Sequence, residues 1–530
     1  MYATHSPSFL LGFPRMSSTR YIPIIGLEIH VRLKTKTKMF CSCANVDDVT
    51  PPNTAICPVC TGQPGALPAL NAEAIRLGVR TGLALGCTIP DHAHFDRKNY
   101  FYPDLPKGYQ ISQYDFPIAQ MGKFVFDVPK KDALAQREQV RIGITRAHLE
   151  EDAAKNMHDA ASSASLIDFN RAGVPLTEIV TEPDFRSPIE AKIFLQELQL
   201  LLRTIGVSDA DMEKGYMRCD ANVSLMAIDE HNMPAQHGYN PKIEIKNINS
   251  FRAVERAITF EIERQHEMLN RGDVPVGATR GWDENKGETF EQRLKETNAD
   301  YRYFPEPDLP SLTLTDIRET EKRHIPELPM ATRARLQAEW GFSEDDARFF
   351  VVNAGWVQYA EAVMNELGSW LESTDTKTTS GGDILEGRKQ ELAKLAAGWL
   401  TSRLAGLLSA MNRTIQDVKI SPEDFAELLH LIDEGTVNSA NGQKLLVLML
   451  EHGTDPSHLL EEHNLGQIDD PQALANLIAQ TIAQNPNQVA QIKSGKLQLI
   501  KWFVGVIMKS TEGRANPEQA EAEVKKQLGI

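Results

Sequence analysis

The stretch Tyr21-Ile-Pro-Ile-Ile-Gly-Leu-Glu-Ile-His-Val-Arg-Leu33 changes from apolar to polar at every second residue of its second half. Successive side chains of an extended chain point to opposite faces, so positions 25, 27, 29, 31 and 33 form one apolar face. The other face carries Gly26, Glu28, His30 and Arg32. We therefore predict a strand that packs on a core and presents a carboxylate and an imidazole on its far side.

Other elements follow from similar patterns, which change in character near residue 311. Alternation predicts strands at residues 123–128, 140–145, 176–180, 218–225 and 242–246. Apolar residues at helical spacing predict helices at residues 189–205 and 251–270. Beyond residue 311 the patterns are helical, and Ser421-Pro-Glu-Asp is a helix-start signal. The sequence thus predicts an α+β fold, in which a mainly antiparallel-sheet domain precedes helical segments.

Length and composition narrow the class of protein. A chain of 530 residues is too long to fold around a single hydrophobic core, so two to four domains are expected. The net charge of −16 means that any contact with nucleic acid must come from local basic patches. Six cysteines do not make a disulfide framework and favour a reducing compartment. No apolar run approaches the roughly 18 residues of a membrane span.

The first 20 residues contain Arg15 and Arg20, several hydroxyl residues and no acid. This composition is compatible with a mitochondrial or plastid transit peptide. A disordered tail, or a true start at Met16, are the alternatives.

Carboxylates occur on or next to three of the predicted strands. Glu28 and His30 share the polar face of the first, and Glu178 lies inside an apolar strand. Four more candidates come just after the predicted strand 140–145: His148, Glu150, Glu151 and Asp152. A carboxylate in an apolar strand is costly unless it is paired or bound to a cation. Carboxylate oxygens with an occasional imidazole suit Mg²⁺ or Mn²⁺. The alternative to a metal site is that these side chains form only salt bridges and hydrogen bonds within the protein.

A basic, aromatic loop spans residues 95–112. It contains the cations Arg97, Lys98 and Lys107 and the aromatic residues Tyr100, Tyr102 and Tyr109. Such cations can contact phosphates, and such rings can stack on a base or ribose. A solvated structural loop is the alternative, and the sequence has neither a Walker phosphate loop nor a Rossmann fingerprint.

Two later strands also carry polar faces. Alternation places Arg218, Asp220 and Asn222 on one face of residues 218–225, and Lys246 on a polar face of residues 242–246. These faces could line a polar cavity, or they could be solvent-facing sheet with cross-strand ion pairs.

Four cysteines lie close together in a loop region rich in Pro and Gly: Cys41, Cys43, Cys57 and Cys60. Two close pairs of thiolates can enclose a structural Zn²⁺ in tetrahedral geometry. Unligated reduced cysteines are the alternative.

Near the C-terminus, four basic residues form a helix face that could contact a phosphate backbone, or could simply be solvated: Lys496, Lys501, Lys509 and Arg514.

The motifs together resemble the B subunits of the glutamyl/aspartyl-tRNA amidotransferases. The matching segments run in order through the chain: Gly26-Leu-Glu-Ile-His30, Phe95-Asp-Arg-Lys-Asn-Tyr-Phe-Tyr-Pro-Asp104, His148-Leu-Glu-Glu-Asp152, Pro175-Leu-Thr-Glu-Ile-Val180, Arg218-Cys-Asp-Ala-Asn222, Glu244-Ile-Lys-Asn-Ile-Asn-Ser250, Asp300-Tyr-Arg-Tyr-Phe-Pro-Glu-Pro-Asp308 and Gly513-Arg-Ala-Asn-Pro517.

The resemblance implies an N-terminal extension at residues 1–20, a catalytic cradle domain at 21–315, a helical domain at 316–417 and a tRNA-binding, YqeY-like tail at 418–530. It implies ATP-dependent conversion of misacylated Glu-tRNA(Gln) or Asp-tRNA(Asn) to the amide, through a phosphorylated side-chain carboxylate. Ammonia would come from a glutaminase partner, the A subunit, while the heterotrimer would be completed by a small C subunit, in a bacterial cytoplasm.

The resemblance also implies roles for residues. Mg²⁺ or Mn²⁺ is expected at Glu28, His30, Glu151 and Glu178, with Glu150 as a substitute. Phosphate or substrate contacts are expected from Lys98, Lys107, Arg218 and Lys246, and ATP contacts from Arg97, Tyr100, Tyr102, Asp220 and Asn222. The alternatives are a non-catalytic tRNA-binding scaffold, a free-standing metalloenzyme and an archaeal-type E subunit.

Overall fold

The computed structural model describes residues 20–129, 137–159, 164–229, 234–294, 301–374, 382–467, 471–511 and 513–530. All but the last residue of the predicted N-terminal extension therefore lies outside the described residues. The chain divides into two compact units, Met1–Leu328 and Pro329–Ile530, each of which is described by itself.

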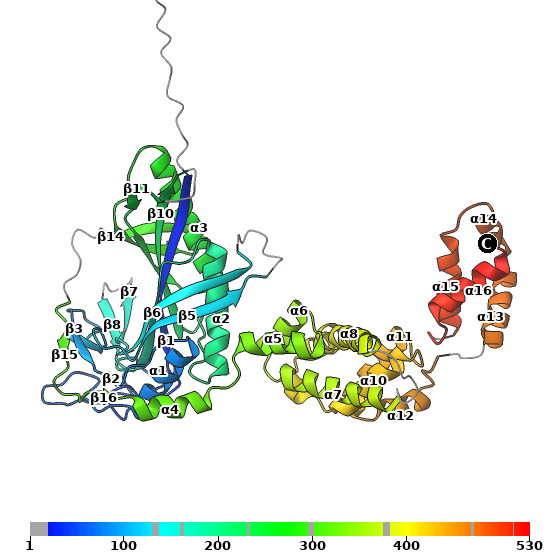
Figure 1. The fold of residues 1–530 in the computed structure, drawn as a ribbon, viewed down its shortest axis with the longest axis horizontal. Helices are drawn as coiled ribbons and strands as arrows, with labels where there is room; N and C mark the ends of the chain where they lie inside the picture. The colour runs from blue at the N-terminus through cyan, green and yellow to red at the C-terminus, as the bar shows by residue number, and fades with distance from the viewer. Residues whose placement is uncertain are drawn as a thin grey trace, which may run out of the picture. The chain divides into compact units, whose positions relative to one another are not determined.

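A nine-stranded sheet forms the centre of the first unit (Figure 1). Its order is β14 (Glu288–Leu294), β13 (Ala278–Asp283), β12 (Ile243–Ile248), β10 (Met217–Ile228), β1 (Arg20–Arg32), β9 (Pro175–Thr181), β6 (Gln139–Glu151) and β5 (Ala119–Asp127), with β11 (Pro234–Tyr239) paired to β10. Among these pairs only β12 and β13 run parallel. The predicted α+β class with a mainly antiparallel sheet is confirmed.

The apolar face of β1 is buried as its sequence predicts. Ile25, Leu27, Ile29 and Val31 are all at most 1% exposed. They join one hydrophobic core with residues of α1 (Ala72–Ala84), α2 (Pro188–Thr204) and α3 (Phe251–Asn270). Each fully buried side chain of this kind contributes about 1.5–3 kcal/mol, so the alternation fixes which face of β1 points inward. The polar side chains of β1 therefore lie on the opposite face of the sheet.

Most predicted elements are present, with one difference that matters for the site. Ser250 caps α3, and its side-chain oxygen accepts a hydrogen bond from the backbone N–H of Ala253. The strand predicted at residues 140–145 is too short, because β6 continues to Glu151. The carboxylates predicted to follow this strand therefore lie within it, and Glu150 and Glu151 point to opposite faces.

Three smaller sheets contain the other described strands of the first unit. The predicted basic loop is a hairpin of β3 (Asp96–Asn99) and β4 (Tyr109–Ser112), to which β15 (Phe304–Pro305) adds a third strand. Short pairs are formed by β7 (Lys155–Asp159) with β8 (Ala164–Asp168), and by β2 (His92–Ala93) with β16 (Leu312–Thr313), just before α4 (Thr315–His324).

The second unit is helical in its described residues. Its elements are α5 (Pro329–Trp340), α6 (Glu344–Val352), α7 (Trp356–Thr374), α8 (Gly382–Gly398), η1 (Trp399–Leu404), α9 (Ala405–Ala410), η2 (Ile415–Asp417), α10 (Pro422–Asp433), α11 (Ser439–His452), α12 (Pro456–Glu462), α13 (Pro471–Gln484), α14 (Pro486–Lys493), α15 (Leu499–Ser510) and α16 (Pro517–Leu528). Ser421 caps α10 in a capping box with Asp424, where the start signal predicted a helix.

Two separate hydrophobic cores stabilise this unit. One extends from Leu336 to Leu459 and therefore contains residues on both sides of the boundary predicted after residue 417. The other lies among α13–α16, from Leu474 to Leu528. The division into a helical domain and a tail remains a prediction.

None of the described helices has the length and apolarity needed to cross a membrane.

Candidate functional site

A histidine and two carboxylates converge on the polar face of the large sheet. They come from three neighbouring strands: His30 from β1, Glu178 from β9 and Glu150 from β6. The register pairs His30 with Glu178, and Glu178 with His148. His30 Nε2 lies 3.4 Å from Glu150 Oε1 and 3.4 Å from Glu178 Oε2. The cross-strand register therefore brings together residues that are far apart in the sequence.

Burial and charge make this group electrostatically unusual. The side chains of Glu150 and Glu178 are only 2% and 10% exposed. Burial by itself would lower the pKa of His30, but Glu178 and Glu150 outweigh it and raise that pKa to about 9. Burial would raise the pKa of Glu178, yet His148 and His30 hold it well below its ordinary value. These shifts favour a protonated imidazole at His30 beside an ionised Glu178.

His30, Glu150 and Glu178 could hold a divalent cation, because one ligand atom from each lies within 4.8 Å of the others. Two carboxylates and an imidazole suit Mn²⁺ and Mg²⁺. Two predicted ligands lie outside this group. Glu28 accepts a hydrogen bond from Asn222 Nδ2 at 2.9 Å. Glu151 pairs with Lys107 and accepts a bond from the Ile111 N–H.

We expect Mn²⁺ binding at this group to strengthen with pH. His30 must lose its proton before Nε2 can ligate, and its pKa of about 9 means that a proton competes with the metal below that pH. Apparent affinity should therefore rise by about tenfold per pH unit from roughly pH 6.5 to 8.5, with release of about one proton. Calorimetric titration in two buffers of different ionisation enthalpy measures both quantities.

The control for this titration is His30→Asn, which carries no titrating proton. Its Mn²⁺ affinity should be weaker and nearly independent of pH over the same range. A wild-type affinity that does not change with pH would contradict the assignment of His30 as a ligand.

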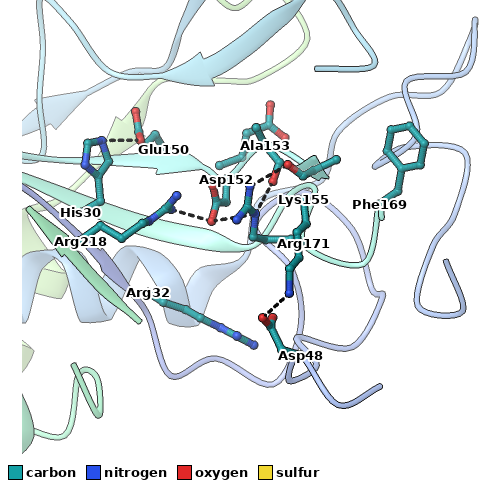
Figure 2. A network of polar contacts seen from close by, with 12 residues as sticks. His30, Arg32, Asp48, Glu150, Asp152, Ala153, Lys155, Phe169, Arg171 and Arg218 are labelled. Atoms are coloured by element: carbon teal, nitrogen blue, oxygen red, sulfur yellow. Dashed lines mark hydrogen bonds and ion pairs between the residues drawn. The ribbon is translucent and has the colours of Figure 1, made fainter. Parts of the chain in front are cut away.

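A polar cavity of about 370 Å³ is lined by two of the three residues, His30 and Glu150. Its lining includes Lys98, Tyr100, Asp152, Arg171, Arg218, Asp220, Lys246 and Asn249. Arg218 Nη2 donates to Asp152 Oδ2 at 2.7 Å, and Arg171 Nε lies 3.7 Å from the same oxygen (Figure 2). Burial would raise the pKa of Asp152, but Arg218 and Arg171 outweigh it and lower that pKa. The cavity is therefore walled by fixed ion pairs.

One cation of this cavity stands out because no close anionic partner is found for it among the described residues. Lys246 Nζ is held by Asp220 at 2.9 Å and by Glu244 at 3.2 Å. Within the described part of the chain, Lys98 Nζ has no carboxylate within 4.0 Å and lies over the Tyr301 ring at 5.1 Å. Burial would lower the pKa of Lys98, but Glu150 and Glu178 outweigh it and raise that pKa. Lys98 is thus a charged ammonium group open to an anionic ligand.

A second cavity of about 410 Å³ lies further along the same sheet face. Gly26, Glu28, Asn222, Tyr239 and Lys242 are among its lining residues. Because Glu28 lines this cavity and His30 the first, β1 carries both cavities on its polar face.

Three other predicted residues lie outside both cavities. Lys107 Nζ lies 2.6 Å from Glu151 Oε1. Arg97 is held by Glu306 at 2.7 Å, and its guanidinium lies 4.3 Å from the centre of the Tyr109 ring. Tyr102 is 64% exposed. Arg97 is therefore a structural cation of the hairpin rather than a free one.

Sequence patterns gave no individual role to three residues that the structure places at the site. His148 and Asp152 stand in the run with Glu150, and extending the strand pattern to residue 151 would have put His148 on the same face as Glu150. Arg171 lies in the turn between β8 and β9, where no periodicity marks it.

The four predicted cysteines also converge. Their sulfur atoms all lie within 4.8 Å of one another, so they could hold a metal ion such as Zn²⁺. The backbone N–H of Cys57 donates to Cys60 Sγ at 3.2 Å. A hydrogen bond with Cys41 lowers the pKa of Cys60 to about 4, and nearby Lys38 acts in the same direction. Burial raises the pKa of Cys43 to about 11.

Comparison with known proteins finds both halves of the chain in one family. Residues 23–318 match the family model described as the GatB/GatE catalytic domain, and residues 383–528 match the model described as the GatB domain. Over 515 residues the chain is 44% identical to the B subunit of the aspartyl/glutamyl-tRNA(Asn/Gln) amidotransferase of Thermotoga maritima, covering 96% of this chain and 99% of the relative. A protein of the same name from Thermomicrobium roseum is 44% identical over 500 residues, which cover 94% and 96% of the two chains. Another from a Synechococcus strain is 42% identical over 518 residues, or 97% and 98%.

Proposed function

The chain belongs to the family of B subunits of the aspartyl/glutamyl-tRNA(Asn/Gln) amidotransferases, and we propose that the polar face of its large sheet carries out the ATP-dependent step of that reaction. The observation that supports this most directly is the placement of the open Lys98 ammonium beside His30, Glu150 and Glu178. The candidate metal site and the lysine that can bind a phosphate thus lie together, as phosphoryl transfer requires.

The reaction is the amidation of a glutamate or aspartate already esterified to tRNA. A side-chain carboxylate resists attack by ammonia, because the leaving group would be oxide or hydroxide. Transfer of the γ-phosphoryl group of ATP to a carboxylate oxygen gives ADP and an acyl phosphate. Ammonia then attacks the acyl carbon, the bond to the phosphate oxygen breaks, phosphate leaves, and the nitrogen loses a proton to give the amide. Free energy from ATP thereby drives amide formation.

In this scheme His30, Glu150 and Glu178 hold Mg²⁺ or Mn²⁺, which when bound neutralises charge on the phosphates. Lys98 contacts the phosphoryl group that is transferred. Arg218 is fixed by Asp152, Arg171 is fixed by the carbonyl oxygens of Ala153 and Ala154, and both arginines line the cavity. Lys246, fixed by Asp220, also lines the cavity. Rigid ion pairs of this kind orient donors without a reorganisation cost during the reaction.

The second cavity is proposed to take the nucleoside of ATP. Its volume falls in the range of small-molecule sites, and it shares β1 and β10 with the first cavity. Asn222 and Tyr239 line it and offer an amide and a ring. This placement fits Asn222 as an ATP contact, with Glu28 in the same cavity as a positioning group that accepts its hydrogen bond.

Partners and the remaining sites complete the proposal. The glutaminase partner, which is the A subunit, supplies ammonia, and the heterotrimer is completed by the C subunit, in the cytoplasm of a bacterium. Misacylated tRNA is bound by the cradle and by the tail. The tail contact is assigned to the basic residues of α15 and its neighbours: Lys496, Lys501, Lys509 and Arg514. Cys41, Cys43, Cys57 and Cys60 hold a structural Zn²⁺, which their mutual spacing supports.

The test is amide formation on Glu-tRNA(Gln) and Asp-tRNA(Asn) by the co-expressed A, B and C subunits. ATP, Mg²⁺ and ammonium chloride are supplied, so that free ammonia bypasses the glutaminase. We expect amide on tRNA together with one ADP per amide, and no product without ATP or Mg²⁺. Product that forms without ADP release would contradict the acyl-phosphate route. No product on either tRNA would favour a non-catalytic, tRNA-binding scaffold.

A further inference from the structure

Lys38 is a lysine with no exposed surface, next to the four-cysteine cluster. Its Nζ lies 3.5 Å from Cys60 Sγ and donates to the carbonyl oxygen of Phe169 at 3.1 Å. Its backbone N–H donates to the Cys43 carbonyl oxygen at 2.9 Å. The side chain and the main chain of one residue therefore contact both halves of the cluster.

A buried ammonium group is costly unless an anion compensates it. Within the described part of the chain, Lys38 has no carboxylate within 4.0 Å, so the sulfur atoms are the only close source of negative charge. Four thiolates around one Zn²⁺ carry a net charge of about −2, which attracts a cation placed against one sulfur.

We propose that Lys38 is the internal counter-cation of the cysteine metal centre and sets its affinity for Zn²⁺. The inference rests on the proposal that the four cysteines hold zinc, and it goes further by assigning a group outside the ligand set. Second-layer groups of this kind commonly change metal affinity by about 10- to 100-fold.

Lys38 also joins the metal centre to the wall of the polar cavity. The Lys38 side chain donates to the carbonyl oxygen of Phe169, in the turn at residues 169–174. The N–H of the next residue, Met39, donates to the Gly173 carbonyl oxygen of the same turn at 2.7 Å. Gly173 has a φ of +82°, and a Cβ there would lie 3.6 Å from Lys38 Cδ. Figure 2 shows Phe169 and Arg171 of this turn, and Arg171 beside Asp152. Lys38 is thus a positioning residue that holds the turn carrying Arg171.

The test compares Lys38→Met with the wild-type chain and with Lys36→Met as the matched control, because Lys36 is exposed and lies two residues away. Zinc affinity is measured by competition with a chromophoric chelator. We expect Lys38→Met to bind Zn²⁺ about 10- to 100-fold more weakly, and Lys36→Met to bind like wild type. Co²⁺ should give the absorption of a tetrathiolate site in all three proteins, which shows that the ligand set is intact.

A second measurement separates charge compensation from simple packing. Thermal unfolding is recorded with and without bound zinc. A counter-cation stabilises mainly the loaded form, so Lys38→Met should lower the midpoint of the zinc-loaded chain clearly more than that of the metal-free chain. Lys38→Gln, which keeps a donor for the Phe169 carbonyl, should behave like Lys38→Met. Hydrogen exchange at residues 169–174 should increase in Lys38→Met and should increase less in Lys38→Gln, because glutamine can still donate to the Phe169 carbonyl.

The outcomes are distinguishable. Equal zinc affinity in wild type and Lys38→Met, or equal loss of stability with and without zinc, would overturn the role of Lys38 alone. If the wild-type chain bound no zinc, the metal assignment of the cysteines would fail together with it, and amide formation in the ammonium assay would still report on the sheet site independently.

Discussion

Glu150→Gln should lower amide formation from ammonium chloride by about 100-fold or more. The substitution keeps the size of the side chain but removes one of two carboxylates that face His30 Nε2. Loss of one charged ligand both weakens Mg²⁺ binding and leaves charge on the transferred phosphoryl group less well neutralised. Single-turnover amide formation, measured over a Mg²⁺ titration, should show a higher half-saturating Mg²⁺ concentration as well as a lower limiting rate.

The matched control is Glu151→Gln, one residue along the same strand but on its opposite face. This variant releases Lys107, whose Nζ lies 2.6 Å from Glu151, and leaves the three-residue group intact. Its Mg²⁺ dependence should match wild type whatever happens to its rate. A Mg²⁺ shift in Glu151→Gln with none in Glu150→Gln would instead support the ligand set that the family resemblance implies.

Lys98→Met should lower the rate of ADP formation driven by misacylated tRNA by about 100-fold. Lys98 is the cation of the polar cavity that has no carboxylate within 4.0 Å among the described residues, so its charge is available to a phosphate. Removing a preorganised cation at a developing charge removes about 3 kcal/mol of transition-state stabilisation. The loss should appear mainly in kcat, with a smaller rise in the KM for ATP.

Two comparisons sharpen this measurement. Lys98→Arg keeps the charge with a different shape and should retain intermediate activity. Lys123→Met removes an exposed lysine of β5 and should leave the rate unchanged. If Lys98→Met changed only the KM for tRNA, Lys98 would be a substrate-docking cation and the phosphoryl contact would have to come from Arg218 or Arg171.

The sequence by itself determined the orientation of the central strand and the class of the fold. Alternation along β1 separates Ile25, Leu27 and Ile29 from Glu28 and His30, and burying the apolar set leaves one possible inward face. Local signals also sufficed for helix starts, since the Ser250 and Ser421 caps depend on neighbours only three residues away. Motif order along the chain was enough to identify the family.

Only the tertiary structure decided which polar residues meet. His30, Glu178 and His148 lie in line because β1, β9 and β6 pair in one particular register, and that register depends on the packing of the whole sheet. Extension of β6 to residue 151 turns Glu150, not Glu151, toward His30.

The ion pairs could not be predicted from the sequence either. Nothing local shows that Lys246 is held by carboxylates whereas Lys98 is open, or that Lys38 lies against Cys60. These contacts join residues on different strands and loops, so their geometry exists only once the sheet, the hairpin and the cysteine loop have packed. Local alternation and capping are encoded within a few residues, but a site that spans several strands is set by long-range register and burial.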